Sequence, residues 1–264
     1  MSWLEQLPQP VIFGHRGASA WAPENTLAAF RLAVEHGAPA IELDVKLTAD
    51  RQVVVLHDQS VDRTTDGHGD LRQFTLAQLR ELDAGSFFSA QFQGEKIPAL
   101  AEVFEAVGKQ VYINVELTNY ASTGDHLTDL VAELVRQSGM QGRVMFSSFH
   151  PANLLSIKRL VPEAPVGLLT LEGRAGWLGR GLYGRWITPT IIHPYFQDVN
   201  EHFMRRQNRL HRRVHVWTVD DPKELLRLVS MGVVGIFTND PRLALRTLNQ
   251  SCQVDHKNLG LPVF

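Results

Sequence analysis

The chain has 264 residues and a nearly balanced charge, with 26 Lys and Arg against 28 Asp and Glu and a formal net charge of −2. That balance argues against a general nucleic-acid or membrane-surface binder, because both need a basic excess. A single cysteine, Cys252, excludes an internal disulfide and a thiolate metal cluster.

The sequence offers neither a targeting segment nor a membrane span. Residues 1–10 lack a basic start and an apolar stretch long enough for a signal peptide. Elsewhere, apolar runs fall well short of the roughly 18 residues that a membrane helix needs. We therefore expect a cytoplasmic protein without stable membrane insertion, whose oligomeric state the sequence leaves open.

Apolar runs typical of buried strands alternate with amphipathic segments typical of helices along the whole chain. The expected strands are residues 11–14, 40–45, 111–116, 143–147, 165–169, 187–191, 213–217 and 234–237. The expected helices are 25–36, 99–108, 125–138, 151–160, 198–210, 221–230 and 240–248, the first with Asn25 as its N-cap. Because one barrel commonly takes about 250 residues, the pattern predicts a single (β/α)8 TIM-barrel domain over residues 1–264.

A ninth apolar run, Gln52–His57, does not fit an ordinary barrel strand. Only residues 49–51 separate it from the preceding strand, whereas a parallel crossover needs a dozen or more residues. The run is therefore predicted to fold back as an antiparallel hairpin that pairs Leu47 with Val53 and Val45 with Val55. This register brings His57 beside Glu42 and Asp44.

Two long excursions leave the predicted barrel. Residues 58–98 form a small insertion with a short helix expected near 75–83, and residues 170–186 form a loop rich in Gly, Trp and Leu. Both follow strand ends, so both are expected to lie over the active face. Loops of this length are commonly lids or binding elements, although a covering without substrate contact fits equally well.

Chemically active side chains end four of the apolar runs. An α/β enzyme builds its site at strand ends, because the strand is rigid and the following loop is open. Two histidines, three carboxylates and an arginine recurring in this way indicate metal-assisted acid–base chemistry; they are His15, Arg16, Glu42, Asp44, His57 and Glu116.

The carboxylates are candidates for a metal site. Glu42 and Asp44 are two residues apart on a strand and point to the same side, where two unpaired carboxylates repel each other. A cation removes that cost, and Glu116 from another strand end completes an oxygen-rich set. Such a set suits Mg²⁺ or Ca²⁺ better than zinc. The alternative is that nearby arginines hold Glu42 and Asp44.

The two histidines are candidates for a general acid and a general base, because imidazole titrates near neutrality. Arg16 follows His15 directly, and its guanidinium is suited to bidentate contact with phosphate oxygens. A salt bridge from Arg16 to Glu42 or Asp44 is the alternative.

Several ordered segments together resemble the glycerophosphodiester phosphodiesterase family, over nearly the whole chain. They are residues 15–26 (HRGASAWAPENT), 41–48 (IELDVKLT), 56–58 (LHD), 62–67 (DRTTDG), 97–100 (IPAL) and 235–241 (GIFTNDP). The resemblance implies hydrolysis of a small-molecule glycerophosphodiester to sn-glycerol 3-phosphate and an alcohol. It also implies that His15 and His57 are catalytic and that Glu42, Asp44 and Glu116 bind one divalent cation. A cyclic phosphate intermediate and direct attack by water both remain open.

One position departs from the family pattern. The acid equivalent to Glu116 is usually followed two residues later by lysine, whereas this chain has Thr118. A strand places residues two apart on the same side, so Thr118 is expected to face the phosphate without adding charge. Lys46 is not expected to substitute, because it lies down the hairpin.

Three more side chains follow strand ends. Trp217 is expected to form an apolar wall at the barrel mouth, near the glycerol or alcohol group. His150 and His193 fit either substrate contact or a structural role.

Two rival functions stay open. A lysophospholipase D would seat an acyl chain on residues 170–186, and an apolar groove from Glu42 to Trp177 and Tyr183 would favour it. A non-catalytic phosphodiester-binding module is suggested by the missing lysine but disfavoured by the complete set of acids and histidines.

Overall fold

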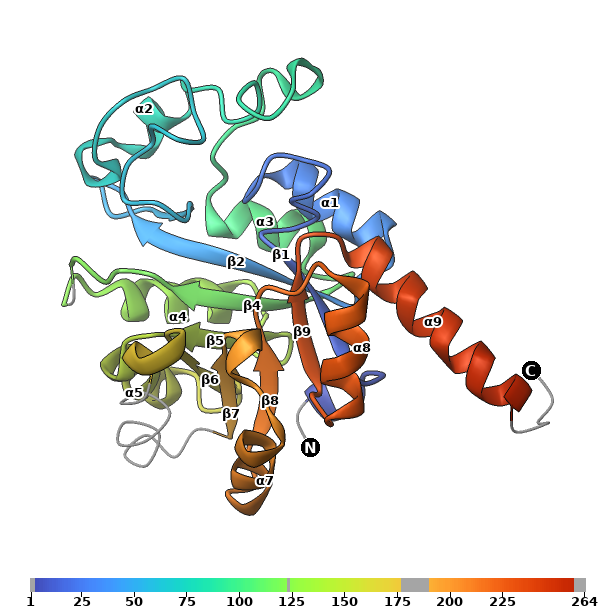
Figure 1. Cartoon of the computed structure of the whole chain (residues 1–264). Coiled ribbons are helices and arrows are strands. Elements are labelled where there is room, and N and C mark those ends of the chain that lie inside the picture. Colours follow the sequence, from blue (N-terminus) through green and yellow to red (C-terminus); the bar gives the residue numbers. More distant parts are fainter. Residues whose placement is uncertain (1–2, 123, 177–189, 259–264) are drawn as a thin grey trace.

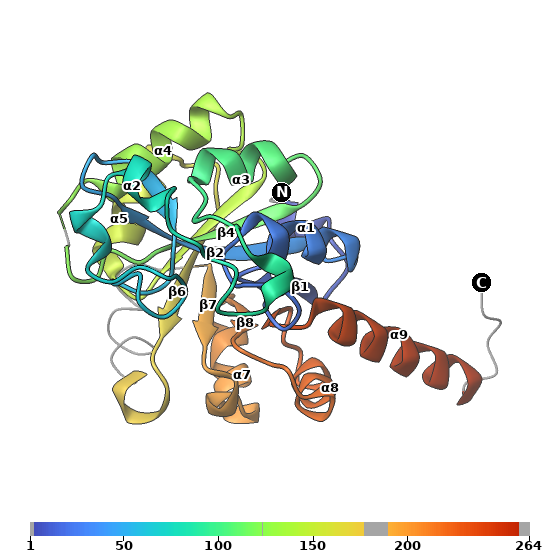
Figure 2. The ribbon, with the colours of Figure 1, turned by 90° about the horizontal axis from the view of Figure 1, so that it is seen from above.

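The structure is a computed structural model that describes residues 3–122, 124–176 and 190–258. Within these residues, eight parallel strands form a barrel that closes where the first strand pairs with both the second and the last (Figures 1 and 2). The strands are β1 (Val11–His15), β2 (Ala40–Leu47), β4 (Tyr112–Leu117), β5 (Val144–Ser148), β6 (Val166–Thr170), β7 (Ile191–Pro194), β8 (Arg213–Val216) and β9 (Gly235–Thr238). The predicted TIM barrel is therefore confirmed; of the strand expected at 187–191, residues 187–189 lie outside the described range.

Helices pack around the outside of this barrel (Figure 2). The longer ones are α1 (Leu27–Glu35), α3 (Leu100–Val107), α4 (Leu127–Gln137), α5 (Pro151–Leu160), α7 (Glu201–Arg209), α8 (Pro222–Ser230) and α9 (Pro241–Asn258). Shorter turns are η1 (Trp3–Glu5), η2 (Leu71–Gln73), α2 (Leu76–Leu79), η3 (Ala90–Phe92), η4 (Gly173–Gly176) and η6 (Phe196–Asp198). Helix α9 is ten residues longer at its carboxyl end than the expected 240–248, and α2 is shorter than the expected 75–83. In the described part of the chain, no helix combines the length and the apolar character that crossing a bilayer requires.

The first helix corrects one prediction, because Thr26 and not Asn25 is its N-cap. Thr26 has the extended backbone of a cap, and its hydroxyl accepts a hydrogen bond from the Ala29 N–H. Asn25 has a φ of 58°, a left-handed conformation that asparagine tolerates better than most residues. Its side-chain amide donates to Asp44 Oδ2 at 2.9 Å, so Asn25 serves the site and not the helix.

Alternation along β2 decides which side chains reach the barrel interior. Ile41 and Leu43 are fully buried against the helices, in the same cluster as Phe30 of α1. Glu42 and Asp44 face the opposite side, as the two-residue period of a strand requires. Burial of the apolar face therefore fixes the direction of the two acids.

The amino-terminal ends of the strands are closed by aromatic packing. The Trp3 ring stacks on Tyr112 with centroids 4.2 Å apart, within a cluster that includes Phe13, Ile191 and Phe237. With that end filled, the open end of the barrel is the carboxyl end of the strands, where active sites of this fold lie.

The predicted hairpin is confirmed. Strand β3 (Val53–Val55) runs antiparallel to β2 with Val45 opposite Val55 and Leu47 opposite Val53. It is shorter than the expected Gln52–His57, so His57 lies in the loop that follows. Residues 58–98 continue as the insertion drawn above the end of β2 in Figure 1, where Val61, Leu71 and Leu79 form a small core together with Val54 and Leu56 of the hairpin segment.

Candidate active site

A cavity of about 430 Å³ opens at the carboxyl ends of the strands. Its lining combines ionisable, polar and apolar side chains. Its lining residues are His15, Arg16, Glu42, Asp44, His57, Asn114, Glu116, Ser147, Phe149, Leu169, His193, Trp217 and Phe237.

Three carboxylates converge in this cavity. Glu42 and Asp44 come from β2 and Glu116 from β4, where Asp44 and Glu116 are register partners. One oxygen atom of each lies within 4.8 Å of the others. Buried Glu42 Oε1 has no hydrogen-bond partner among the described residues, which leaves it free for a cation. The donors are all oxygen, the set that Mg²⁺ and Ca²⁺ prefer.

The electrostatics of the triad also fit a cation. Burial, together with the charge of Asp44, raises the pKa of Glu116 to about 8. Burial and the neighbouring carboxylates raise the pKa of Glu42 well above its usual range. Burial would raise the pKa of Asp44 too, but Arg16 and the Asn25 amide hold it below its usual range. A divalent cation would offset the burial and mutual repulsion of these acids, and it would displace the proton that Glu116 holds near neutral pH.

His15 reaches the cavity from the end of β1. Asn239 donates through Nδ2 to Asp220, so its Oδ1 is the acceptor that meets His15 Nδ1 at 2.8 Å. The hydrogen of the neutral ring is thereby fixed on Nδ1, and Nε2 lies 3.9 Å from Glu42 Oε2. Burial and the nearby Arg16 charge lower the pKa of His15 to about 4, which leaves the ring neutral near pH 7.

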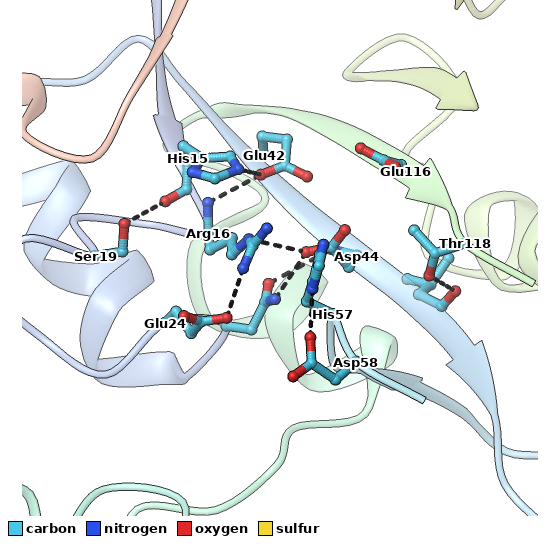
Figure 3. Close-up of polar contacts among 12 residues, drawn as sticks. His15, Arg16, Ser19, Glu24, Glu42, Asp44, His57, Asp58, Glu116 and Thr118 are labelled. Carbon is cyan, nitrogen blue, oxygen red and sulfur yellow. Dashed lines mark hydrogen bonds and ion pairs between the residues drawn. The ribbon is translucent and has the colours of Figure 1, made fainter. Parts of the chain in front are cut away.

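His57 enters the site from the loop after β3, where Figure 3 shows it paired with Asp58. Its Nδ1 lies 2.6 Å from Asp58 Oδ1, and its side chain is 42% exposed against 19% for His15. A carboxylate only accepts hydrogen bonds, so Nδ1 carries hydrogen here as well. In each histidine, Nε2 is left to exchange a proton.

Arg16 joins the acids to the loop after β1 (Figure 3). Its φ of 55° turns the chain so that its own N–H donates to Glu42 Oε2 at 2.9 Å. Its Nη1 donates to Glu24 at 2.7 Å, and its Nε lies 3.4 Å from Asp44 Oδ2. The alternative salt bridge to Asp44 is present, and the same side chain also lines the cavity.

Trp217 and His193 both line the cavity, as the sequence suggested for substrate contacts. Trp217 stands edge-on to Phe149, with ring centroids 5.8 Å apart, and its Nε1 donates to the His193 carbonyl at 2.9 Å. The His193 ring is fully buried, and neither of its nitrogens has a hydrogen-bond partner within the described residues. Burial lowers the pKa of His193 to about 3, so the ring is neutral. His150 precedes α5 and is not among the cavity residues.

Thr118 does not line this cavity. It follows the last residue of β4, and its hydroxyl donates to the Val45 carbonyl at 2.9 Å while accepting from Lys46 Nζ at 2.6 Å. Contrary to the sequence prediction, the Lys46 side chain does not stay along the hairpin: its ammonium reaches Thr118, two residues beyond Glu116, and its charge partly offsets the rise in the pKa of Glu116. Lys46 is not among the cavity residues. Trp177 and Tyr183, toward which an apolar groove would favour a lysophospholipase D, lie outside the described residues.

Sequence reasoning missed the residues that support the histidines and the arginine. Asp58, Arg63 and Glu24 connect His57 to Arg16, and Asn239 holds His15. All four belong to the motifs that carried the family resemblance, which was the one signal for them. Asn114 and Ser147 add a polar floor, with Asn114 Nδ2 donating to Ser147 Oγ at 2.8 Å.

Comparisons with known proteins show the family to which this chain belongs. The model of the glycerophosphoryl diester phosphodiesterase family matches residues 15–243. A glycerophosphodiester phosphodiesterase of Caldanaerobacter subterraneus subsp. tengcongensis is 34% identical over 246 residues, which cover 91% of this chain and 98% of the relative. One from Bacillus subtilis is 31% identical over 243 residues, with 87% and 83% covered.

A solved structure is similar over the same extent. An Oleispira antarctica phosphodiesterase in complex with the product sn-glycerol-3-phosphate superposes with a TM-score of 0.86 and 30% identity, covering 94% of this chain and 100% of that one. The family match spans all the candidate acids and histidines. The chain therefore belongs to the glycerophosphoryl diester phosphodiesterase family, and it is a phosphoric diester hydrolase.

Proposed function

We propose that this enzyme cleaves glycerophosphodiesters to sn-glycerol 3-phosphate and an alcohol, with Glu42, Asp44 and Glu116 holding one divalent cation. The observation that carries the proposal is the meeting of three carboxylates and two separately supported histidines in one cavity. The product bound to the Oleispira antarctica enzyme supports the same reaction.

The cation would be Mg²⁺ or Ca²⁺, because every donor of the triad is a carboxylate oxygen. When bound, it would supply Lewis-acid stabilisation of the phosphate oxygens and of a nearby hydroxyl. Arg16 would contribute a fixed positive charge beside it. That guanidinium is held by Glu24 and Asp44, so it is already oriented before substrate arrives.

His15 is proposed as the general base. Its ring is neutral and its Nε2 lone pair is available, so it takes the proton from the attacking hydroxyl, of glycerol or of water. As the new P–O bond forms, the bond to the alcohol breaks. Attack by water gives sn-glycerol 3-phosphate directly, whereas attack by the glycerol hydroxyl gives a cyclic phosphate that water must then open to yield the same product. His57 is proposed as the general acid that gives the leaving oxygen its proton from Nε2. Asp58 opposite Nδ1 is placed to stabilise the protonated ring.

The remaining lining would orient the organic groups. Trp217, Phe149 and Leu169 form an apolar wall for carbon atoms. His193 is proposed as a contact for a glycerol hydroxyl, because it lines the cavity and its two buried ring nitrogens have no hydrogen-bond partner within the described residues. Thr118 is not proposed as a phosphate contact, because it is turned toward Lys46.

The proposal is tested by assay against glycerophosphocholine, glycerophosphoethanolamine and a lysophospholipid. The enzyme is stripped with a chelator and reloaded with Mg²⁺ or Ca²⁺, and released glycerol 3-phosphate is measured. We expect turnover of the first two substrates only when a cation is present. Release of an alcohol from the lysophospholipid at a higher kcat/KM would favour the lysophospholipase D alternative.

Glu42→Gln tests the metal site separately. It removes a charge from the triad while keeping the size of the side chain, so bound metal and activity should fall together. Glu133→Gln is the control, because Glu133 is an exposed residue of α4 that does not line the cavity. Full metal binding by Glu42→Gln would contradict the assignment.

A further inference from the structure

We infer that Arg63 is a positioning residue, which fixes His57 and Arg16 relative to each other through Asp58 and Glu24. The inference rests on the proposed function, since it assumes that His57 and Arg16 act on the substrate. Arg63 belongs to the insertion and does not line the cavity itself.

The Arg63 guanidinium binds two carboxylates at once. One edge meets Asp58, with Nε donating to Oδ2 at 2.6 Å and Nη2 to Oδ1 at 3.2 Å. The other edge meets Glu24, with Nη1 donating to Oε2 at 2.8 Å and Nη2 to Oε1 at 2.7 Å. Only a guanidinium offers two such planar edges; a lysine ammonium is a point charge without them.

Each of these carboxylates also holds one residue of the proposed machinery. Asp58 Oδ1, which Arg63 contacts, is the atom that lies 2.6 Å from His57 Nδ1. Glu24 Oε1, which Arg63 also contacts, accepts from Arg16 Nη1 at 2.7 Å. Figure 3 shows the two ends of this connection, at His57–Asp58 and at Arg16–Glu24. His57 and Arg16 therefore share one support, although they come from different loops.

The connection differs from an ordinary surface ion pair, which contributes little. It is a network of four charged groups and a histidine, and the exposed fraction is 18% for the Glu24 side chain and 29% for Asp58. Without Arg63, two neighbouring carboxylates would repel each other and release their partners. Arg63 hydrogen bonds hold the pKa of Asp58 well below its usual range, and Arg63 with Arg16 overcomes burial to bring the pKa of Glu24 to about 2. Both therefore stay ionised acceptors at neutral pH.

The position of Arg63 also gives the insertion, residues 58–98, a function: it supplies the residue that restrains His57. His57 follows a three-residue strand, so the hairpin alone gives its ring little restraint. Arg63 ties the start of the insertion to Glu24 in the loop after β1, 39 residues away. Loss of this tie should let the His57 ring turn away from the cavity, which lowers kcat, and should free Arg16, which raises KM.

The test compares Arg63→Ala with Arg72→Ala. Arg72 lies in the same insertion, is similarly exposed and makes a bidentate contact to Asp70 alone. We expect Arg63→Ala to lower kcat by about 10-fold to 100-fold, the usual cost of losing an outer-shell support, and to raise KM. Its Tm should match that of Arg72→Ala. Millimolar ethylguanidinium should restore part of kcat, and ethylammonium should not.

Two further readouts separate positioning from folding. In a His57→Ala background, Arg63→Ala should lower kcat no further, because the residue through which it acts is gone. The ¹⁵N shifts of the His57 ring should show hydrogen on Nδ1 in the wild type and a mixture of tautomers in Arg63→Ala. This second readout needs no turnover.

Opposite outcomes overturn the inference in distinct ways. A wild-type kcat and an unchanged His57 ¹⁵N spectrum in Arg63→Ala would show that Arg63 does not position His57. A fall in activity that follows Tm, with both restored in parallel by ethylguanidinium, would show a purely structural tie. If the wild-type enzyme is inactive but Arg63→Ala still changes the His57 ¹⁵N spectrum as expected, the proposed function would be contradicted. The inference that Arg63 positions His57 would stay supported.

Discussion

The two histidines of the site are supported in contrasting ways. His15 stands at the end of a buried barrel strand, is largely covered, and is held by the neutral amide of Asn239. His57 stands in a loop after a short hairpin strand, is half-exposed, and is held by Asp58 within an ionic network. A rigid strand end needs one neutral hydrogen bond to fix a ring, whereas a loop-borne ring in contact with solvent needs charged partners.

The contrast also separates the proposed chemical roles. The neutral, buried surroundings of His15 suit a base that must be unprotonated at the start of the reaction. The carboxylate next to His57 suits a ring that must deliver a proton. The difference in support thus favours the role of base for His15 and the role of acid for His57, which the residue type alone does not decide.

Removing the imidazole ring of His15 or of His57 should lower kcat more than any other change considered. We expect His15→Ala and His57→Ala each to lower kcat by about 10²–10⁴-fold, the usual range for a lost acid or base. His126→Ala is the control, because His126 is an exposed histidine that pairs with Asp129 outside the cavity. Steady-state kinetics at saturating cation measure the effect. Near-normal kcat in either site variant would remove that histidine from the mechanism.

Changing the residues that hold the two histidines, Asp58 and Asn239, should separate the two kinds of support. Asp58→Asn should lower kcat by about 10-fold to 100-fold, as outer-shell losses do, with little change in Tm because the site is half-exposed. Asn239→Ala leaves the part-buried Nδ1 of His15 without its acceptor, and such a loss costs about 1–3 kcal/mol of unfolding free energy. Kinetics and thermal unfolding of the two variants measure the difference. Equal losses of stability in the two variants would show that His15 and His57 are supported alike.

Much of this site could be predicted from the sequence. The alternation of Ile41, Glu42, Leu43 and Asp44 gave the direction of the acids, and the short link before Val53 required the hairpin. Both depend on backbone periodicity and chain length, which are local properties. The pairing register of the β2–β3 hairpin followed from the same periodicity and from the short link.

The parts that could not be predicted depend on side chains meeting across loops. Arg63 and Glu24 are 39 residues apart in segments without periodicity, so no pattern announces their contact. Lys46 was expected to stay along the hairpin, but its long flexible side chain reaches Thr118, just beyond the end of neighbouring strand β4. The N-cap was assigned one residue early, because Asn25 adopts a left-handed conformation that sequence alone does not reveal.

The carboxylate triad between the two histidines should make the effect of metal depend on pH. Glu116 has a usual pKa of 4.5 in the unfolded chain and about 8 in the folded one, so the folded, metal-free protein holds a proton that the unfolded chain loses. Stability of the metal-free protein should therefore fall as pH rises from 4.5 to about 8. A cation replaces that proton, so the rise in Tm on adding Mg²⁺ should be greater near pH 8 than near pH 6.

Thermal unfolding with and without Mg²⁺ across this pH range checks the expectation. Glu116→Gln is the matched variant, since it carries no ionisable group at that position and should flatten the dependence. A Tm gain that is equal at both pH values in the wild type would contradict the raised pKa of Glu116.

Thr118→Lys should change turnover least. The sequence predicts that Thr118 faces the phosphate, and on that basis a lysine here would strengthen the phosphate contact and lower KM. The structure leads us to expect otherwise, because Thr118 is buried, lies outside the cavity and already accepts a hydrogen bond from the Lys46 ammonium at 2.6 Å. A second ammonium there would meet the first in a poorly hydrated place, at a cost of about 1–3 kcal/mol of unfolding free energy.

The measurements that decide between these two expectations are Tm and KM for glycerophosphocholine at saturating cation, with Thr118→Ser as the control that keeps the hydroxyl. We expect Thr118→Lys to lower Tm and to leave KM unchanged, because Lys46 already places one positive charge near Glu116. A lower KM at unchanged Tm would show that the new ammonium extends past Lys46 to the phosphate. In that case the expectation from the sequence would hold, and the cationic side of the site would reach beyond Arg16.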